Sequence, residues 1–250
     1  MATQGAPGTC VVCRGPAGGG DRACFSCRTV AQRLGAPPSP VVPAFACPAP
    51  GPLYAVLLGY KEAPVDEARR HFARVVRGVL DEFLAVHAPC VAAAAGGATE
   101  LVLPVPSTRR PGPPALGRVE GLAEVVAARL GGACWDPALL RRTDRPIGHM
   151  QPHRDAFAVA ARRQVAGSRV ALVDDVYVSG ARAQSAASAL RGAGAASVVI
   201  VVLGRVLRPE RVARHARFLG VPGAPPVWRG RTGADPCGRC VRPQARVSTE

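Results

Sequence analysis

The sequence predicts an α/β protein: a central parallel sheet with helices on both faces, joined to a small N-terminal metal-binding module. Residues 170–173 are apolar, and a short Ser/Gly/Arg turn and an Ala-rich segment with helical character (183–193) follow them. That order indicates a strand, a loop and a helix. Residues 198–203 form a continuous apolar run, which is typical of a strand buried in a parallel sheet.

The spacing of apolar residues predicts the other elements. Residues 53–58 are a short apolar run, for which we predict a strand. Between residues 65 and 86 apolar side chains recur at the spacing of a helix face. Residues 100–105 are predicted to form the first core strand, and residues 119–130 an amphipathic helix.

The chain length suits one α/β domain of ordinary size with a small appendage. We divide the 250 residues into a zinc knuckle with a Pro-rich linker (1–45), the α/β domain (46–207) and a basic, partly disordered tail (208–250). The tail contains Cys237-x2-Cys240. Two cysteines supply only two metal ligands, so half of a metal site, a redox pair and a chance occurrence all remain open.

The formal net charge of +15 indicates an anionic partner without identifying it. Positive fields attract polyanions such as pyrophosphate compounds and single-stranded nucleic acid. Lys61 is the only lysine among 32 basic residues, and an ordinary exposed lysine is the simplest interpretation of it. No apolar run reaches the 18 or so residues of a membrane span, so membrane insertion is not expected. Nine cysteines without a signal peptide favour a reducing, cytoplasmic location.

An acid pair follows the apolar run at 170–173. Asp174 and Asp175 are placed at the carboxyl end of the predicted strand, which is where open α/β sheets bind ligands. The loop at 178–182 can hold a phosphate on backbone N–H groups and a helix N-terminus. The acids can hold sugar hydroxyls or hydrated Mg²⁺. A sugar phosphate fits these features together; the alternative is a buried strand that ends in a solvated acid pair.

Four cysteines near the N-terminus have the spacing of a structural zinc site. Cys10-x2-Cys13 is followed after ten residues by Cys24-x2-Cys27, and four thiolates provide the tetrahedron that Zn²⁺ takes. The intervening stretch has almost no large apolar residues, so metal binding would supply its folding energy. Disulfides are the alternative, but they require a secreted chain.

A polar segment follows the strand predicted at 100–105. Ser107, Thr108, Arg109 and Arg110 place hydroxyls and arginines at the carboxyl end of that strand. Such groups suit a pyrophosphate-binding loop. A polar loop in a basic protein is an equally good interpretation.

Residues 170–182 resemble the signature of type I phosphoribosyltransferases, enzymes that use phosphoribosyl pyrophosphate (PRPP). The resemblance implies the type I phosphoribosyltransferase fold. It also implies that Asp174 and Asp175 contact the ribose 2′- and 3′-hydroxyls, directly or through Mg²⁺. The residues that would wrap the 5′-phosphate are Val178, Ser179, Gly180, Ala181 and Arg182. Val178 and Arg182 stand where the family commonly has threonine, and Arg182 would give a charge-assisted contact instead.

A four-cysteine knuckle ahead of such a domain resembles the ComF family, which is named for a competence protein. Further matching pieces are Tyr60-Lys61, Pro104-Val105-Pro106, Gln151 and Ala156-Phe157. The resemblance covers residues 8–207. Gly117-Arg118-Val119-Glu120 departs from the family's usual motif in a region that would lie near the pyrophosphate and the second substrate.

The resemblance implies a reaction in which a nitrogen nucleophile displaces pyrophosphate from C1 of Mg-PRPP. The nucleophile cannot be identified from the sequence, and self-association into a homo-oligomer stays open. The alternative function is a non-catalytic protein that uses the same fold to bind single-stranded DNA or to assist DNA uptake. The low aromatic content, 4%, argues against that alternative because single-strand binding uses stacking on aromatic rings.

Overall fold

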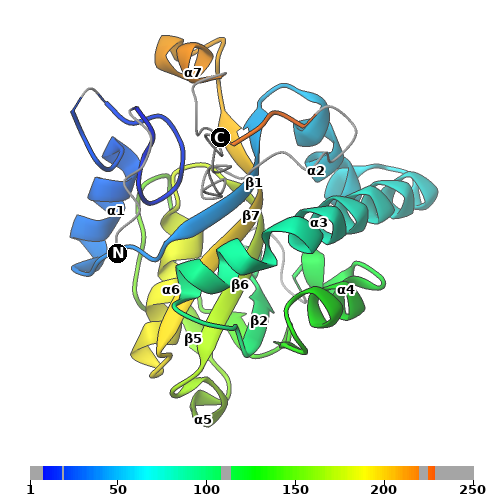
Figure 1. The fold of residues 1–250 in the computed structure, drawn as a ribbon, viewed down its shortest axis with the longest axis vertical. Helices are drawn as coiled ribbons and strands as arrows, with labels where there is room; N and C mark the ends of the chain where they lie inside the picture. The colour runs from blue at the N-terminus through cyan, green and yellow to red at the C-terminus, as the bar shows by residue number, and fades with distance from the viewer. Residues whose placement is uncertain (1–7, 19, 108–113, 220–224, 229–250) are drawn as a thin grey trace, which may run out of the picture.

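The computed structural model describes residues 8–18, 20–107, 114–219 and 225–228. Its centre is a five-stranded sheet in the order β1-β7-β6-β2-β3, in which every neighbouring pair is parallel (Figure 1). The strands are β1 (Val41–Pro48), β2 (Leu101–Pro104), β3 (Cys134–Trp135), β6 (Arg169–Tyr177) and β7 (Ser197–Leu207). The α/β class and the central parallel sheet predicted from the sequence are therefore confirmed.

The two central strands are buried on both faces, as their apolar runs predicted. On β7, Val199 and Val201 pack into one layer of the core, whereas Val198 and Ile200 pack into the other. This alternation follows from the two-residue period of a strand. Two separate layers of helices can therefore cover the sheet.

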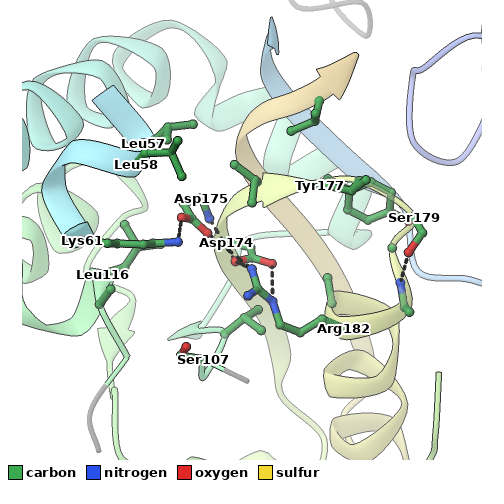
Figure 2. Close-up of a pocket in the computed structure, with 18 of the residues that line it drawn as sticks. Leu57, Leu58, Lys61, Ser107, Leu116, Asp174, Asp175, Tyr177, Ser179 and Arg182 are labelled. Atoms are coloured by element: carbon green, nitrogen blue, oxygen red, sulfur yellow. Dashed lines mark hydrogen bonds and ion pairs between the residues drawn. The ribbon is translucent and has the colours of Figure 1, made fainter. Parts of the chain in front are cut away.

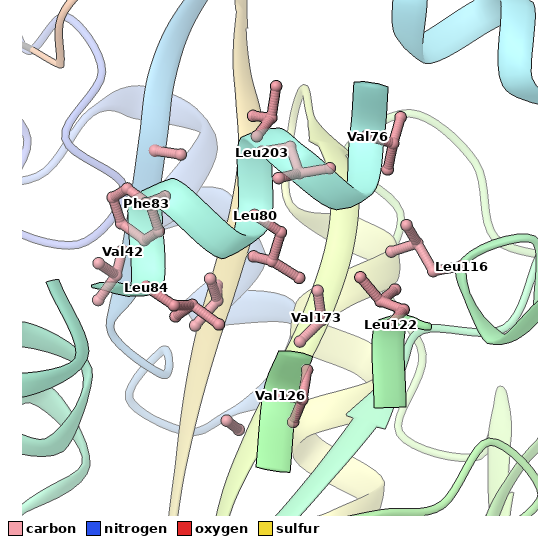
Figure 3. Packing of buried hydrophobic residues seen from close by; sticks show 14 of the residues in the cluster. Val42, Val76, Leu80, Phe83, Leu84, Leu116, Leu122, Val126, Val173 and Leu203 are labelled. Atoms are coloured by element: carbon pink, nitrogen blue, oxygen red, sulfur yellow. The ribbon is translucent and has the colours of Figure 1, made fainter. Parts of the chain in front are cut away.

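One face is covered by α2 (Pro52–Glu62), α3 (Asp66–Ala95) and α4 (Leu122–Arg129). Leu80, Phe83 and Leu84 of α3 point into the space above the sheet, where they meet Val126 of α4 and Val173 of β6 (Figure 3). The opposite face carries α1 (Phe25–Leu34), α5 (Arg162–Val165), α6 (Ala181–Gly192) and the antiparallel pair β4 (Leu140–Arg142) and β5 (Phe157–Val159). A short 3-10 helix, η1 (Leu116–Arg118), precedes α4, and α7 (Ala213–Phe218) follows β7.

The strand predicted at residues 53–58 is wrong, because these residues belong to helix α2. Pro52 is in the first turn, where proline favours a helix start. The buried positions Leu53, Val56, Leu57 and Tyr60 have the spacing of one helix face. The apolar run at 53–58 was too short to distinguish the period of a strand from the period of a helix. Including Tyr60 completes the helical period.

One helix is longer than predicted. The helix predicted at 65–86 continues to Ala95 and ends at Gly96, which adopts a left-handed conformation with φ of 76°. By length and composition α3 could cross a membrane, and it is the only such helix in the described part of the chain. It packs along the sheet through Val76, Leu80 and Leu84, as the core helix of a globular domain does.

The division of the chain proposed from the sequence can be compared with the packing. The boundary at residue 45 falls inside β1. Beyond residue 207, Phe218 packs against Ala46 and Leu207, and Trp228 joins the core under α2 and α3. The first part of the tail thus lies on the sheet. Cys237 and Cys240 lie outside the described residues.

Candidate functional site

A pocket of about 620 Å³ lies at the carboxyl ends of β2 and β6. The acid pair of β6 and the loop at 178–182 form one wall, and the last turn of α2 brings Tyr60 and Lys61 (Figure 2). Ser107 follows β2 and also lines the pocket. The structure therefore brings together residues from three distant parts of the sequence, at the edge where parallel sheets bind ligands.

The two acids lie within β6, because the strand runs beside β7 as far as Tyr177 and Arg205. Both are buried, with 3% of Asp174 and 2% of Asp175 exposed. The backbone N–H of Asp175 donates to Asp174 Oδ1 at 3.0 Å. A strand that ends in a solvated acid pair, the alternative considered above, does not describe these residues.

Arg182 and Lys61 reach the acid pair from two different helices (Figure 2). Arg182 Nη2 lies 2.6 Å from Asp174 Oδ1 and Nε lies 3.3 Å from Asp174 Oδ2, while Nη2 is also 3.4 Å from Asp175 Oδ1. Lys61 Nζ forms an ion pair with Asp175 Oδ2, to which Tyr60 Oη donates at 3.1 Å. Buried carboxylates need such partners because desolvation disfavours an isolated charge.

The protonation of these partners follows from their surroundings. The Asp174 carboxylate raises the pKa of the Arg182 guanidinium. Burial, reinforced by Asp174, raises the pKa of Tyr60. The phenol thus stays protonated at neutral pH and acts as a hydrogen-bond donor. Two carboxylates face two cations and one neutral donor at this end of the pocket.

The loop after β6 is a tight turn that leads into helix α6. Gly180 has φ of 85°, and a Cβ atom there would lie 2.1 Å from Tyr177 Oη, so no larger residue fits. Ser179 Oγ accepts hydrogen bonds from the N–H groups of Met150 at 3.2 Å and Ala181 at 3.5 Å. Helix α6 begins at Ala181, and N–H groups of a first helical turn suit a phosphate.

Several predicted and unpredicted residues can now be placed. All five predicted phosphate-loop residues line the pocket with the acid pair. Of the predicted pyrophosphate loop, Ser107 lines the pocket, whereas Thr108 and Arg109 lie outside the described residues. Arg118 also lines the pocket; it belongs to the segment 117–120 that the resemblance placed near the pyrophosphate. The loop at 147–149, which was not predicted as part of the site, lines the pocket as well.

Lys61 was interpreted from the sequence as an ordinary exposed lysine, and that interpretation is wrong. Its side chain is 26% exposed and is paired with Asp175. The two residues are far apart in the sequence and meet because α2 packs beside the end of β6. Two signals were available in the sequence: Lys61 is the only lysine among 32 basic residues, and Tyr60-Lys61 was among the pieces that resemble the ComF family.

The four N-terminal cysteines form a second site. Cys10, Cys13, Cys24 and Cys27 are buried, and their sulfur atoms lie within 4.8 Å of one another. Cys13 Sγ and Cys24 Sγ are 3.8 Å apart, close to the roughly 3.8 Å edge of a tetrahedron with Zn–S bonds of about 2.3 Å. Hydrogen bonds from the other three cysteines, Cys10 first, hold the pKa of the Cys13 thiol well below its usual value. This set could hold a metal such as zinc.

The fold and the two sites define an α/β protein with a polar, ion-paired pocket at the carboxyl end of a parallel sheet and a four-cysteine cluster near the N-terminus. No family model matches the chain, and no curated protein matches it.

Proposed function

We propose that the protein is a ComF-like phosphoribosyltransferase that binds Mg-PRPP and transfers its phosphoribosyl group to a nitrogen nucleophile. The observation that carries this proposal is the joint presence, on one pocket, of the buried acid pair, the glycine-containing loop and the N-terminus of α6. Two buried carboxylates suit vicinal hydroxyls, and the loop suits a phosphate monoester. A ribose 5-phosphate group is the simplest ligand that presents both.

Arg182 would change partners when the ligand binds. In the ligand-free pocket it neutralises Asp174 and reaches Asp175. A 5′-phosphate in the loop would attract the guanidinium, since a phosphate offers the same bidentate acceptor geometry as a carboxylate. The carboxylate oxygens released by Arg182 would then accept hydrogen bonds from the ribose hydroxyls. With this exchange of partners, an arginine at position 182, where type I phosphoribosyltransferases commonly have threonine, is compatible with activity.

The reaction forms a bond between the nucleophilic nitrogen and C1 and breaks the bond from C1 to the pyrophosphate oxygen. The bonding electrons leave with pyrophosphate, and the nitrogen loses a proton. The ribose ring passes through an oxocarbenium-like state, so the protein acts mainly by positioning and electrostatics. Asp174 and Asp175 would fix the ring, and Ser107 would lie on the side of the leaving group.

Mg²⁺ and Zn²⁺ have different places in this proposal. Carboxylate oxygens suit Mg²⁺, but all four oxygens of the acid pair already have a cation or an N–H or O–H donor within the chain. We therefore propose that Mg²⁺ enters with PRPP, and that it neutralises pyrophosphate as it leaves. Zn²⁺ is assigned a structural role at the four-cysteine cluster, whose thiols remain available in the reducing cytoplasm.

Calorimetry with Mg-PRPP tests the proposal. Wild-type protein should bind, and Asp174→Asn with Asp175→Asn should lose binding by at least about tenfold, since each good charge-assisted hydrogen bond contributes about 1.5–3 kcal/mol. The matched control is Asp66→Asn with Glu67→Gln, an adjacent acid pair exposed at the start of α3, which should bind like wild type. Absence of binding by the wild type would reject the enzyme and favour the DNA-binding alternative. A screen of amines and nucleobases for pyrophosphate release would then identify the nucleophile.

A further inference from the structure

Arg205 lies between the four-cysteine cluster and the phosphate loop. It belongs to β7, and only 5% of it is exposed. Its Nη1 donates to the carbonyl oxygens of Tyr177 at 3.0 Å, Val178 at 2.9 Å and Val206 at 2.9 Å. The guanidinium also lies 5.4 Å from the centre of the Tyr177 ring. Arg205 thus holds the backbone from which the loop at 178–182 departs.

The other side of the guanidinium faces the cysteine knuckle. A Cβ on Gly15 would lie 2.7 Å from Arg205 Nε and 2.9 Å from Nη2, so the knuckle backbone closes directly over the charge. Nε is buried and makes no hydrogen bond within the described residues.

A second contact joins the same two parts of the molecule. Tyr177 Oη lies 4.0 Å from Cys27 Sγ and 3.5 Å from Gln184 Nε2. Gln184 in turn hydrogen-bonds both backbone groups of Ser39, at 2.8 and 2.9 Å, in the segment between the knuckle and β1. The knuckle, the loop and the first turns of α6 therefore share one buried polar network.

A metal-loaded cysteine cluster would supply a counter-charge for Arg205. Four thiolates with one divalent cation carry a net charge of about −2. A buried guanidinium needs negative charge nearby to offset its desolvation. The described hydrogen bonds and ring contact of Arg205 are with carbonyls and an aromatic ring, and none is with a carboxylate. A metal-loaded cluster, behind the Gly15 backbone that faces the guanidinium, would be its counter-charge.

We propose that Arg205 is a positioning residue that couples metal loading of the four-cysteine cluster to the shape of the phosphate loop. The loaded cluster holds the guanidinium, and the guanidinium holds the Tyr177 and Val178 carbonyls at the start of the loop. Loss of the metal releases Arg205 and loosens the loop. The ligand part of this inference rests on the proposed function, whereas the link between cluster and loop does not.

Coupling between two sites is reciprocal, so it can be measured from the metal side. Ribose 5-phosphate is the probe, because it engages the loop and the acid pair without pyrophosphate. In wild-type protein, saturating ribose 5-phosphate should tighten zinc, measured by competition with a chromophoric chelator, by about fivefold or more, the lower range of allosteric couplings. In Arg205→Met the zinc affinity should not respond to the ligand. Equal tightening of zinc in both proteins would overturn the proposal.

If Arg205→Met does not fold, two further variants still test the proposal. Arg205→Lys keeps the charge but loses the planar fork, and Gly15→Ala pushes the guanidinium from the knuckle side while every cysteine is retained. Both should weaken the response of zinc affinity to ribose 5-phosphate. The control is Arg211→Met, which removes an exposed arginine and should keep the full response. An unchanged response in Arg205→Lys and Gly15→Ala would contradict the coupling.

Hydrogen exchange separates failure of the coupling from failure of the proposed function. In zinc-loaded protein without ligand, amides 177–183 should exchange at least about fivefold faster in the Arg205 variants than in Arg211→Met, since local opening controls their protection. If wild type binds no ribose 5-phosphate, the proposed function fails and this exchange difference still tests the positioning role. Identical exchange in the variants and the control would refute it.

Discussion

Arg182 holds Asp174 through two hydrogen bonds, of 2.6 Å from Nη2 to Oδ1 and 3.3 Å from Nε to Oδ2. The residue expected to bind phosphate therefore contacts the residue expected to bind ribose. In the proposed complex the guanidinium would pair with the phosphate, and the Asp174 carboxylate would accept hydrogen bonds from the ribose hydroxyls instead.

Arg182→Thr introduces the residue that the family usually has, and we expect it to lower the free energy of unfolding by about 3 kcal/mol. Removing one partner of a buried ion pair is strongly destabilising because the other charge stays buried without a partner. Here that charge is the Asp174 carboxylate. Urea denaturation measures the loss. Arg163→Thr changes an exposed arginine in α5 and should cost little. Equal stabilities of the two variants would mean that Asp174 does not depend on Arg182.

Gly180→Ala should destabilise the protein by about 1–2 kcal/mol or more, because an L-residue is strained at positive φ, here 85°. The new Cβ would also collide with Tyr177 Oη, so binding of sugar phosphate should fall. Gly192→Ala is the matched control, since that glycine is helical and nothing lies within 4 Å of a Cβ there. Thermal denaturation should show a lower melting temperature for Gly180→Ala than for Gly192→Ala, and calorimetry should show weaker binding of sugar phosphate. Equal melting temperatures and affinities would contradict the special role of Gly180.

We expect about one zinc ion per chain in the purified protein. Cys10→Ser with Cys13→Ser should abolish it and lower the melting temperature, because metal binding contributes to folding of a segment with little core. Cys134→Ser, which alters an exposed cysteine, should retain the metal. Zinc retained by the double variant would place the metal elsewhere, with Cys237 and Cys240 the first residues to replace.

The DNA-binding alternative is tested by removing residues 229–250, which contain five arginines and two acids. The cut follows Trp228 because Phe218 and Trp228 pack in the core, so deletion from residue 208 would also damage the fold. If residues 229–250 bind single-stranded DNA, the truncated protein should bind that DNA more weakly. Its affinity should also depend less steeply on salt, since fewer phosphate contacts release fewer counterions.

Mg-PRPP binding should survive the same truncation, because the pocket lies upstream. DNA affinity that is unchanged by truncation would exclude residues 229–250 as a DNA-binding element. Strong DNA binding by the full chain without any PRPP binding would favour the alternative over the enzyme.

The sequence by itself determined the parts whose signal is local. Strands β6 and β7 are buried apolar runs, and their class follows from residues adjacent in the chain. The four cysteines were found from their spacing. The loop at 178–182 was found from the order of apolar run, turn and Ala-rich segment, together with the resemblance to type I phosphoribosyltransferases. A short apolar run fits either a strand or a helix, so residues 53–58 were predicted to form a strand. The helical spacing of α2 becomes clear only when Tyr60 is counted with Leu53 and Leu57.

Only the tertiary structure decided the charge arrangement of the site. Tyr60 and Asp175 are 115 positions apart, and the partners of Lys61 and Arg205 depend on how α2 and the knuckle pack against the sheet. No periodicity encodes such pairs, because the side chains meet through packing of whole elements rather than through spacing along one of them. In a chain with 32 basic residues, the packed surroundings of Lys61, Arg182 and Arg205 are what assign these three cations to the two sites.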